Sequence, residues 1–490
     1  MPLGPLYFFA EYGNAQVDTI YPAFHQLLLL PAYALAMGGY WATGGISHLS
    51  STWPYGMHDV SLFFSTLIIL SNLVSALMGL AILYIAWRFC VPHQSWAWTG
   101  ILMAALSGVF VYYCRVGNLD IPYNFWWAIS LFFLWRYFFD GAVFHVSLFP
   151  AAIAAACAVG SKDQASGLVL GAGVAILTIG SLAAPRFSDR FRHAVRFTFW
   201  MLVFYTVVAI LPHPLRWYYH LQYVLAGKAP TEIPRTVAGE WRIFLVTLDW
   251  LVKVFPIPAI VLAAAGAWFL FRSGQGRQFW LLAIPAITYY VIAVAPTRVF
   301  YPRFSVPLFL PMIVLITHGA GFLAQRLFAS PRRTLGWAAA LAALLMLQCA
   351  FSYVPVTYAQ VFDRKRQLAA ELPSVLPPGS SLLISRMQSY NYPNRQVYDA
   401  YKLMLLPQDP IMPPSRHAAN LFHPLDSGVR YFLLGSGNTG QPWNPIGKYP
   451  RLTGAPVREW RYPAWVKNHV LVPCIYEFAL YRRTGPLPVE

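Results

Sequence analysis

Apolar runs of membrane length recur along the chain between residues 20 and 352. A helix needs about 20 predominantly apolar residues to cross the hydrocarbon core of a bilayer. Hydrophobic residues make up 58% of the chain and charged residues only 11%, whereas soluble domains carry about 25% charged residues. The sequence therefore predicts a polytopic α-helical membrane protein with about ten or eleven membrane helices. The runs cover about 20–41, 60–89, 96–114, 121–139, 142–159, 165–184, 195–211, 250–271, 279–295, 304–326 and 335–352.

The chain changes character at Tyr353, where it becomes polar and rich in proline, with no further run of membrane length. Such a change marks a domain boundary, so we expect a membrane domain over 1–352 and an extramembrane domain over 353–490. A helix is predicted over Asp363–Leu372, closed by Pro373 and the prolines after it. Short strand-like pieces complete a small α/β domain, and they are Ser381–Ile384, Tyr431–Leu434 and Tyr476–Tyr481.

Arginine clusters predict the orientation of the membrane domain. Short loops rich in Lys and Arg remain in the cytoplasm, and three loops of this kind are Arg186–Arg196, Arg272–Arg277 and Arg326–Arg333. The opposite side, which in a bacterium is the periplasm, then receives the C-terminal domain. We therefore expect a multi-pass protein of the bacterial inner membrane whose C-terminal domain is periplasmic.

This orientation leaves many cations in the outer loops, where basic residues should be scarce. One explanation is contact with the headgroups of the outer leaflet, which is worth about 1 kcal/mol per residue. The other explanation is a site for a phosphate group, because arginine and lysine are its usual partners. The outer cations are Arg115, Lys162, Arg216, Lys228, Arg235, Arg242, Arg298 and Arg303.

The segment Cys114–Trp127 places Arg115 and Asp120 between two apolar runs, at the boundary of the membrane. Asp120 precedes Ile121-Pro122, where a helix should begin. One interpretation is an N-cap, because a carboxylate there accepts hydrogen bonds from the first turn. The other is a functional acid that helps to hold an ion or a phosphate beside Arg115.

The net charge of +17 favours contact with anionic membrane lipids over nucleic acid, since no basic arm or zinc-knuckle spacing accompanies it. The five cysteines show neither a disulfide framework nor metal-ligand spacing. The interval 212–242 mixes aromatic residues with Arg216 and His220, which is typical of a segment lying in the membrane interface. His220 alone is better explained as an interfacial histidine than as a catalyst.

Five stretches in the first two thirds of the chain together resemble motifs of the GT-C membrane glycosyltransferases, specifically glycosyltransferase family 39. That group includes protein O-mannosyltransferases and the transferase that adds aminoarabinose to lipid A. The resemblance covers roughly residues 10–330. The matching stretches are Tyr21–His25, Ser75–Gly79 in a helix ending at Tyr84 and Arg88, Arg115–Pro122, Ser161–Leu168 and Tyr301–Pro307.

The resemblance implies transfer of a sugar from a polyprenyl-phosphate carrier to an acceptor (a lipid, a glycan or a protein) at the outer face, with inversion at the anomeric carbon. Cations would stabilise the leaving phosphate, and an acid, or a divalent metal ion held by acids, would activate the acceptor hydroxyl. Asp120 is the implied catalytic acid and candidate metal ligand. The implied substrate-binding residues are Arg115, Lys162, Asp163, Arg216, His220, Arg298, Tyr301 and Arg303.

The chain departs from the family in one respect. The family carries its first catalytic acid in an external loop after a first membrane helix, but only nineteen residues precede Ile20 here. Either the chain is truncated, or its start codon is misassigned, or a nearby acid substitutes. The nearest acids are Glu11, Asp18 and Asp59, of which Glu11 and Asp59 are kept as catalytic candidates.

Two other functions compete with the transferase. A transporter or flippase for a lipid-linked substrate would place its ionisable residues in the middle of helices, near the bilayer midplane. The helix interiors here are nearly free of charge apart from boundary residues such as Arg136. An inactive relative is the third possibility, because the first acidic motif is missing.

Overall fold

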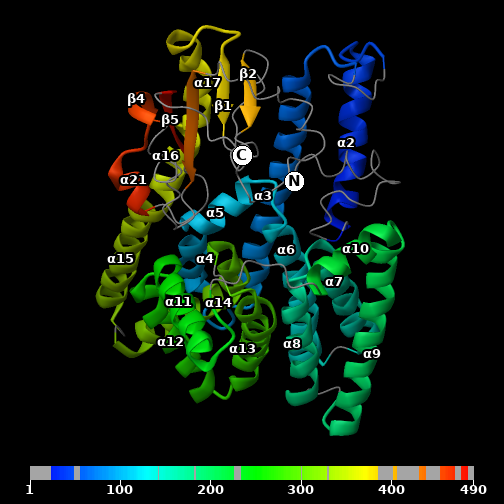
Figure 1. Ribbon diagram of the computed structural model, residues 1–490. Coiled ribbons are helices and arrows are strands. Elements are labelled where there is room, and N and C mark those ends of the chain that lie inside the picture. Colours follow the sequence, from blue (N-terminus) through cyan, green and yellow to red (C-terminus); the bar gives the residue numbers. More distant parts are fainter. Residues whose placement is uncertain are drawn as a thin grey trace. The chain divides into compact units, whose positions relative to one another are not determined.

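The protein is described from a computed structural model, which covers residues 22, 24–48, 56–141, 143–180, 184–225, 233–298, 301–327, 330–384, 401–405, 430–437, 453–469 and 476–483. The chain divides into two compact units, Met1–Gln348 and Cys349–Glu490. The sequence places this change at 353. The first unit is helical, and the second combines helices with a β-sheet (Figure 1).

Most helices of the first unit follow the apolar runs, but Phe187–Tyr205 begins eight residues before the predicted run over 195–211, and Pro214–Leu225 lies in the interval predicted for the membrane interface. The first half of the unit contains α2 (Phe24–Ala42), α3 (Val60–Arg88), α4 (Ala97–Ala105), α5 (Gly108–Arg115), α6 (Asp120–Phe139), α7 (Leu148–Ser161), α8 (Ala165–Thr178) and α9 (Phe187–Tyr205). The second half contains α10 (Pro214–Leu225), α11 (Val237–Val254), α12 (Ile257–Arg272), α13 (Gly276–Tyr289), α14 (Phe309–Leu327) and α15 (Pro331–Gln348). Short helical segments that matter below are η3 (Thr206–Ile210), η4 (Tyr290–Val294), η5 (Ala295–Thr297) and η6 (Pro302–Leu308).

Length and composition identify membrane spans among these helices. In the described residues, six helices are long and apolar enough to cross a membrane, or up to eight if each of two bent pairs is one span. Helices α2 and α6 have 19 and 20 residues, and α8 is a shorter apolar helix. The chain is therefore a multi-pass membrane protein, and these three helices, predicted as spans, are not among the six to eight spans found in the described residues.

Two apolar stretches are bent, which the sequence did not predict. The run over 96–114 is divided into α4 and α5, whose axes differ by 70° at Leu106-Ser107. Helices α11 and α12 differ by 102° at Phe255-Pro256. Pro256 lacks an N–H donor and cannot continue α11, so a new helix begins at Ile257. Only α12 of this pair corresponds to the predicted run over 250–271.

Helices α12 and α14 cross at two glycines. A Cβ atom on Gly266 would lie 1.9 Å from the carbonyl oxygen of Leu315, and one on Gly319 would lie 1.9 Å from that of Leu262. The two backbones are therefore in direct contact at this crossing. Small residues allow such approach between membrane helices, where packing rather than the hydrophobic effect drives association.

Gly266→Ala is expected to force α12 and α14 apart and to lower the stability of the membrane unit by about 1–3 kcal/mol, the usual cost of overpacking. The measurement is a melting curve in detergent. Gly336→Ala on α15 is the matched control, because a Cβ there meets no atom within 4 Å. Equal melting temperatures for the two variants would contradict the close crossing.

The second unit contains a five-stranded sheet in the order β2-β1-β3-β5-β4. Strands β1 and β2 are parallel, β1 and β3 are parallel, and β5 runs antiparallel to both β3 and β4. The strands are β1 (Ser381–Ile384), β2 (Lys402–Leu405), β3 (Tyr431–Gly437), β4 (Thr453–Trp460) and β5 (Tyr476–Arg483). The three strands predicted from sequence are β1, β3 and β5.

Helix α17 (Arg364–Val375) packs on this sheet through Leu368 and Leu372, which share a buried core with Leu382, Leu433 and Leu480. The helix was predicted to close at Pro373 and the prolines after it; it runs two residues past Pro373 and ends at Val375, before Pro377. Glu371 of α17 accepts hydrogen bonds from Arg458 and Trp460 of β4, which fixes the helix against the strand. The remaining helices of the unit are α16 (Val354–Val361) and α21 (Ala464–His469).

Candidate functional site

A buried ion pair joins the first residue of α6 to the residue that follows α7. The Lys162 Nζ atom donates to Asp120 Oδ1 at 2.5 Å, and the two side chains are 1% and 0% exposed. Lys162 is the C-cap of α7 and lies directly after the apolar span Phe144–Ser161. The pair therefore lies at the boundary of a membrane span, as expected for Asp120.

The N-cap interpretation of Asp120 does not hold. The N-cap of α6 is Leu119, which makes no side-chain capping bond, and Asp120 is already helical. The Leu119 N–H donates to the Asn118 side chain instead, at 2.7 Å. The Asp120 carboxylate is therefore engaged by Lys162 rather than by the first turn of its own helix.

Close packing of α6 against α7 brings the two charges together. The inner face of α7 is formed by small buried residues, including Ala151, Ala154 and Ala155, which permit a short distance between helices. Ser130 of α6 donates to the carbonyl oxygen of Ala151 at 2.9 Å. Because the helices are antiparallel neighbours, the start of α6 meets the end of α7 (Figure 1).

Two tyrosines surround the ion pair. Lys162 Nζ lies 5.4 Å from the ring centroid of Tyr123, within the range of a cation–π contact. The Tyr123 hydroxyl is 3.4 Å from that of Tyr289, and both tyrosines are buried. Asn124 donates to the backbone oxygen of Asp120 at 2.7 Å. The pair is thus enclosed by side chains from two helices, α6 and α13.

The Lys162 ammonium also feels charges outside the pair. Burial lowers the pKa of Lys162, whereas the carboxylate of Asp120 raises it, and the net direction is downward. Arg303 lowers this pKa further and Asp163 raises it, so both lie within electrostatic reach of the ammonium. Within the part of the chain that the structure describes, Asp120 Oδ2 has no hydrogen-bond partner.

Arg303 reaches this cluster from η6, which contacts α5 and α6. Its guanidinium stacks on Tyr301 at 4.8 Å and on Phe304 at 5.7 Å, and the side chain is half-buried. The structure therefore brings together three distant parts of the sequence, namely Asp120, the consecutive residues Lys162 and Asp163, and Arg303. We call these four residues the charged cluster. Arg115 ends α5, next to η6, and is exposed to solvent.

The other predicted site residues are not part of the charged cluster. Asp59 is exposed and caps α3, accepting from the Leu62 N–H at 2.9 Å. His220 is buried in α10, and Arg298 pairs with Glu240 of α11. Arg216 belongs to α10, but the structure does not describe its side chain, and Glu11 lies outside the described residues.

Sequence reasoning missed three residues that shape these sites, namely Tyr123, Tyr289 and Glu240. A signal existed for Tyr123, because a residue three positions after Asp120 lies on the same helical face. Tyr289 gave no comparable signal, since it is one of two consecutive tyrosines in an apolar helix and nothing in the sequence distinguishes them. Glu240 stood in an amphipathic stretch that was interpreted as interfacial.

The surroundings of Asp120 do not fit a divalent metal ion. One carboxylate oxygen already faces an ammonium group, and a metal there would need to displace it. Among the described residues, no group of three or more His, Cys, Asp or Glu side chains could hold a metal.

Comparison with solved structures finds chains of similar fold. The crystal structure of ArnT from Cupriavidus metallidurans in the apo state matches with a TM-score of 0.47 and 11% identity, covering 98% of this chain and 92% of that one. The crystal structure of the same protein bound to undecaprenyl phosphate matches with a TM-score of 0.49 and 12% identity, covering 100% and 93%. TM-scores below 0.5 at this identity do not assign an activity or a substrate. No protein-family model and no curated protein sequence matches the chain.

Proposed function

We propose that this protein transfers a sugar from a polyprenyl-phosphate-linked donor to a lipid, glycan or protein acceptor at the outer face of the bacterial inner membrane. The observation that carries the proposal is the buried Asp120–Lys162 pair with Arg303 beside it, at the end of a membrane span. On this proposal the C-terminal unit is periplasmic, and bilayer lipids surround the first unit.

The transfer breaks the bond between the anomeric carbon and the phosphate oxygen, whose electron pair stays with the leaving polyprenyl phosphate. The acceptor hydroxyl forms the new bond to the anomeric carbon and loses its proton to a carboxylate. Negative charge therefore develops on the phosphate oxygen, and fixed cations at that position lower the barrier. The chain supplies Lys162 and Arg303 for this purpose, with Arg115 nearby.

Asp120 acts in this scheme as a positioning residue. Its Oδ1 atom fixes the Lys162 ammonium. The ammonium is buried, so water does not solvate it and the carboxylate stabilises its charge instead. Asp163 is the half-buried carboxylate of the charged cluster, so it is the proton acceptor that a substrate in water can reach. Glu11 and Asp59 are the alternative acceptors. Tyr301 holds the Arg303 guanidinium through its ring.

The location of the pair favours a transferase over a transporter. Asp120 is the first residue of α6 and Lys162 caps α7, so both charges lie at helix ends. A transport path across the bilayer would use ionisable groups near the midplane.

Polyprenyl phosphate is expected to inhibit consumption of a polyprenyl-phosphate-linked sugar by the purified protein, because it is the leaving group and carries the charge that the cations of the charged cluster attract. Polyprenol of equal chain length, which lacks the phosphate, is the matched control and should inhibit at least about tenfold more weakly, the loss of one charge-assisted contact. The assay measures release of polyprenyl phosphate from hexose- and pentose-bearing donors. Equal inhibition by both lipids, or no consumption of any donor, would overturn the proposal.

A further inference from the structure

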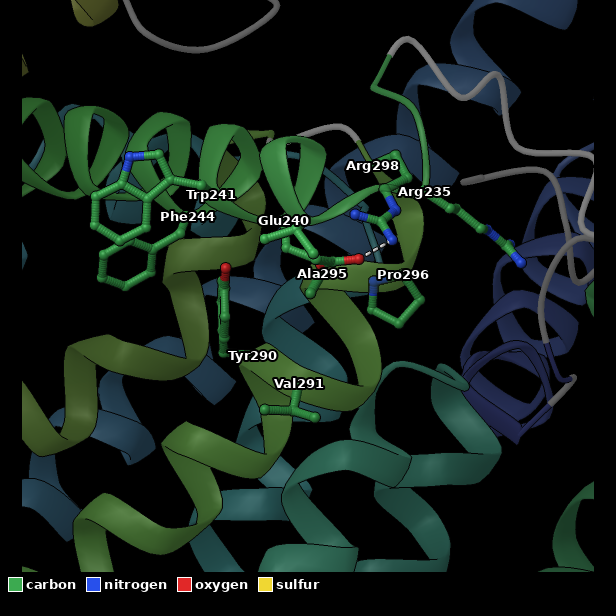
Figure 2. A pocket seen from close by; sticks show the side chains of 10 residues that line it. Arg235, Glu240, Trp241, Phe244, Tyr290, Val291, Ala295, Pro296 and Arg298 are labelled. Carbon is green, nitrogen blue, oxygen red and sulfur yellow. Dashed lines mark hydrogen bonds and ion pairs between the residues drawn. The ribbon is translucent and has the colours of Figure 1, made fainter.

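A cavity of about 700 Å³ lies beneath α11, apart from the residues of the charged cluster. Figure 2 shows Trp241, Phe244 and Glu240 on the face of α11 that is directed toward Tyr290. The opposite wall comes from η4 and η5 and the residue after them, Arg298. The cavity therefore has aromatic walls and a cation at one end.

Arg298 has unused hydrogen-bonding capacity. Its side chain is 7% exposed, and its Nη2 atom donates to Glu240 Oε1. Among the described residues, its Nε and Nη1 atoms have no hydrogen-bond partner. A guanidinium presents five N–H donors in a planar fork that matches a phosphate group. A buried guanidinium with one carboxylate contact is therefore suited to an additional anion.

The backbone holds Arg298 in this position. Its φ angle is 57°, in the left-handed region that most residues avoid. Arg298 ends η5, so the chain turns sharply here and directs the side chain back toward α11. Figure 2 shows the Arg298–Glu240 contact at one end of the cavity, which Arg235 also lines.

Helix α11 has the features of a helix that lies along the membrane surface. Its axis is 102° from that of the apolar helix α12. Its exposed apolar residues recur at helical spacing and form one stripe, consisting of Trp241, Leu245, Leu248 and Val252. A helix with this pattern buries its apolar stripe among lipid chains at the headgroup level. The cavity beneath it is then within reach of a phospholipid.

We propose that this cavity binds a phospholipid of the bilayer, with the lipid phosphate accepting hydrogen bonds from Arg298 and the acyl chains lying against the aromatic wall. Trp241 and Phe244 form that wall with ring centroids 5.5 Å apart, and Tyr290 extends it, 6.3 Å from Phe244. Arg303 acts on Lys162, whereas Arg298 pairs with Glu240, so the two arginines have different partners. The lipid site does not rest on the proposed transferase activity.

Removing the charge of Glu240 and removing that of Arg298 should change lipid affinity in opposite directions. The carboxylate repels a bound phosphate and occupies one donor of Arg298, so its loss should strengthen lipid binding. Loss of the Arg298 charge should weaken it. A purely structural ion pair predicts neither change, because either variant would only loosen α11.

The experiment titrates delipidated, detergent-purified full-length protein with phosphatidylglycerol and counts bound lipid by native mass spectrometry. Arg298→Gln is expected to weaken binding about tenfold, the effect of one charge-assisted contact. Glu240→Gln is expected to strengthen it severalfold. Arg242→Gln, which removes an exposed cation from the same helix, is the matched control and should leave binding unchanged.

Inorganic phosphate and phosphatidylcholine distinguish the source of the anion. Inorganic phosphate should not displace phosphatidylglycerol at equal concentration, because it makes no contact with the aromatic wall. Phosphatidylcholine should bind more weakly than phosphatidylglycerol, since its ammonium group offsets the phosphate charge. Equal competition by inorganic phosphate would overturn the lipid assignment. Unchanged binding in Arg298→Gln, or no gain in Glu240→Gln, would overturn the site.

Discussion

Asp120→Asn is expected to reduce sugar transfer about a hundredfold, the loss of about 3 kcal/mol of transition-state stabilisation. The substitution keeps the shape of the side chain and removes the charge that fixes Lys162. It is also expected to destabilise the membrane unit by about 3–5 kcal/mol, because it leaves an ammonium buried without its partner. Turnover and a melting curve should be measured on the same preparation.

The double variant Asp120→Asn/Lys162→Met separates these two effects. It removes both charges, so no uncompensated ion remains, and much of the lost stability should return. Transfer should stay low, because the cation that faces the phosphate is absent. Recovery of transfer together with stability would show that the pair serves the fold alone. Lys253→Met, which removes an exposed lysine paired with Asp249, is the matched control and should change neither measurement strongly.

Arg303→Gln is expected to reduce transfer by a similar factor, about a hundredfold, with little loss of stability. Arg303 is half-buried and lies close enough to Lys162 to lower the pKa of the ammonium. Its removal therefore relieves a repulsion in the charged cluster while removing a cation from the phosphate. Affinity for polyprenyl phosphate should fall together with turnover.

The control for Arg303 is Arg272→Gln, at the far end of α12. Arg272 also stacks on an aromatic ring, that of Trp268 at 5.3 Å, but it belongs to a predicted cytoplasmic loop. Its loss should leave transfer unchanged. Full activity in Arg303→Gln would remove Arg303 from the site, and a large drop in melting temperature would assign it to the fold.

The sequence was informative about helices because their burial in lipid requires continuous apolar runs. Helices α3 and α6 begin and end within a residue or so of the predicted limits. The bends were harder to predict. The run containing Leu106-Ser107 has no proline, and its 70° break falls at Ser107-Gly108, a Ser/Gly pair of the kind at which helices bend. In the C-terminal unit, Pro373 was given too much weight as a terminator, because the helix continues for two residues beyond it and ends at Val375.

The sequence predicted the site residues whose type is uncommon in their position, and it missed those whose type is common there. Asp120, Lys162 and Arg303 stood out because charges at the outer membrane boundary need a reason. Their mutual approach depends on antiparallel packing of α6 and α7, which spacing alone does not reveal. Tyr289 and Glu240 carried no signal, since a tyrosine in an apolar helix and a glutamate in an amphipathic one are both common.

The Asp120–Lys162 pair also limits how the length of this region can vary. The two residues stand at the open ends of a hairpin, and α6 and α7 are its arms. Deleting one residue within an arm would turn the end of that arm by about 100° around the helix axis and shorten it by about 1.5 Å. The charge would then no longer face its partner. Insertions and deletions are thus compatible with the pair only near the closed end, between Asp140 and Ser147.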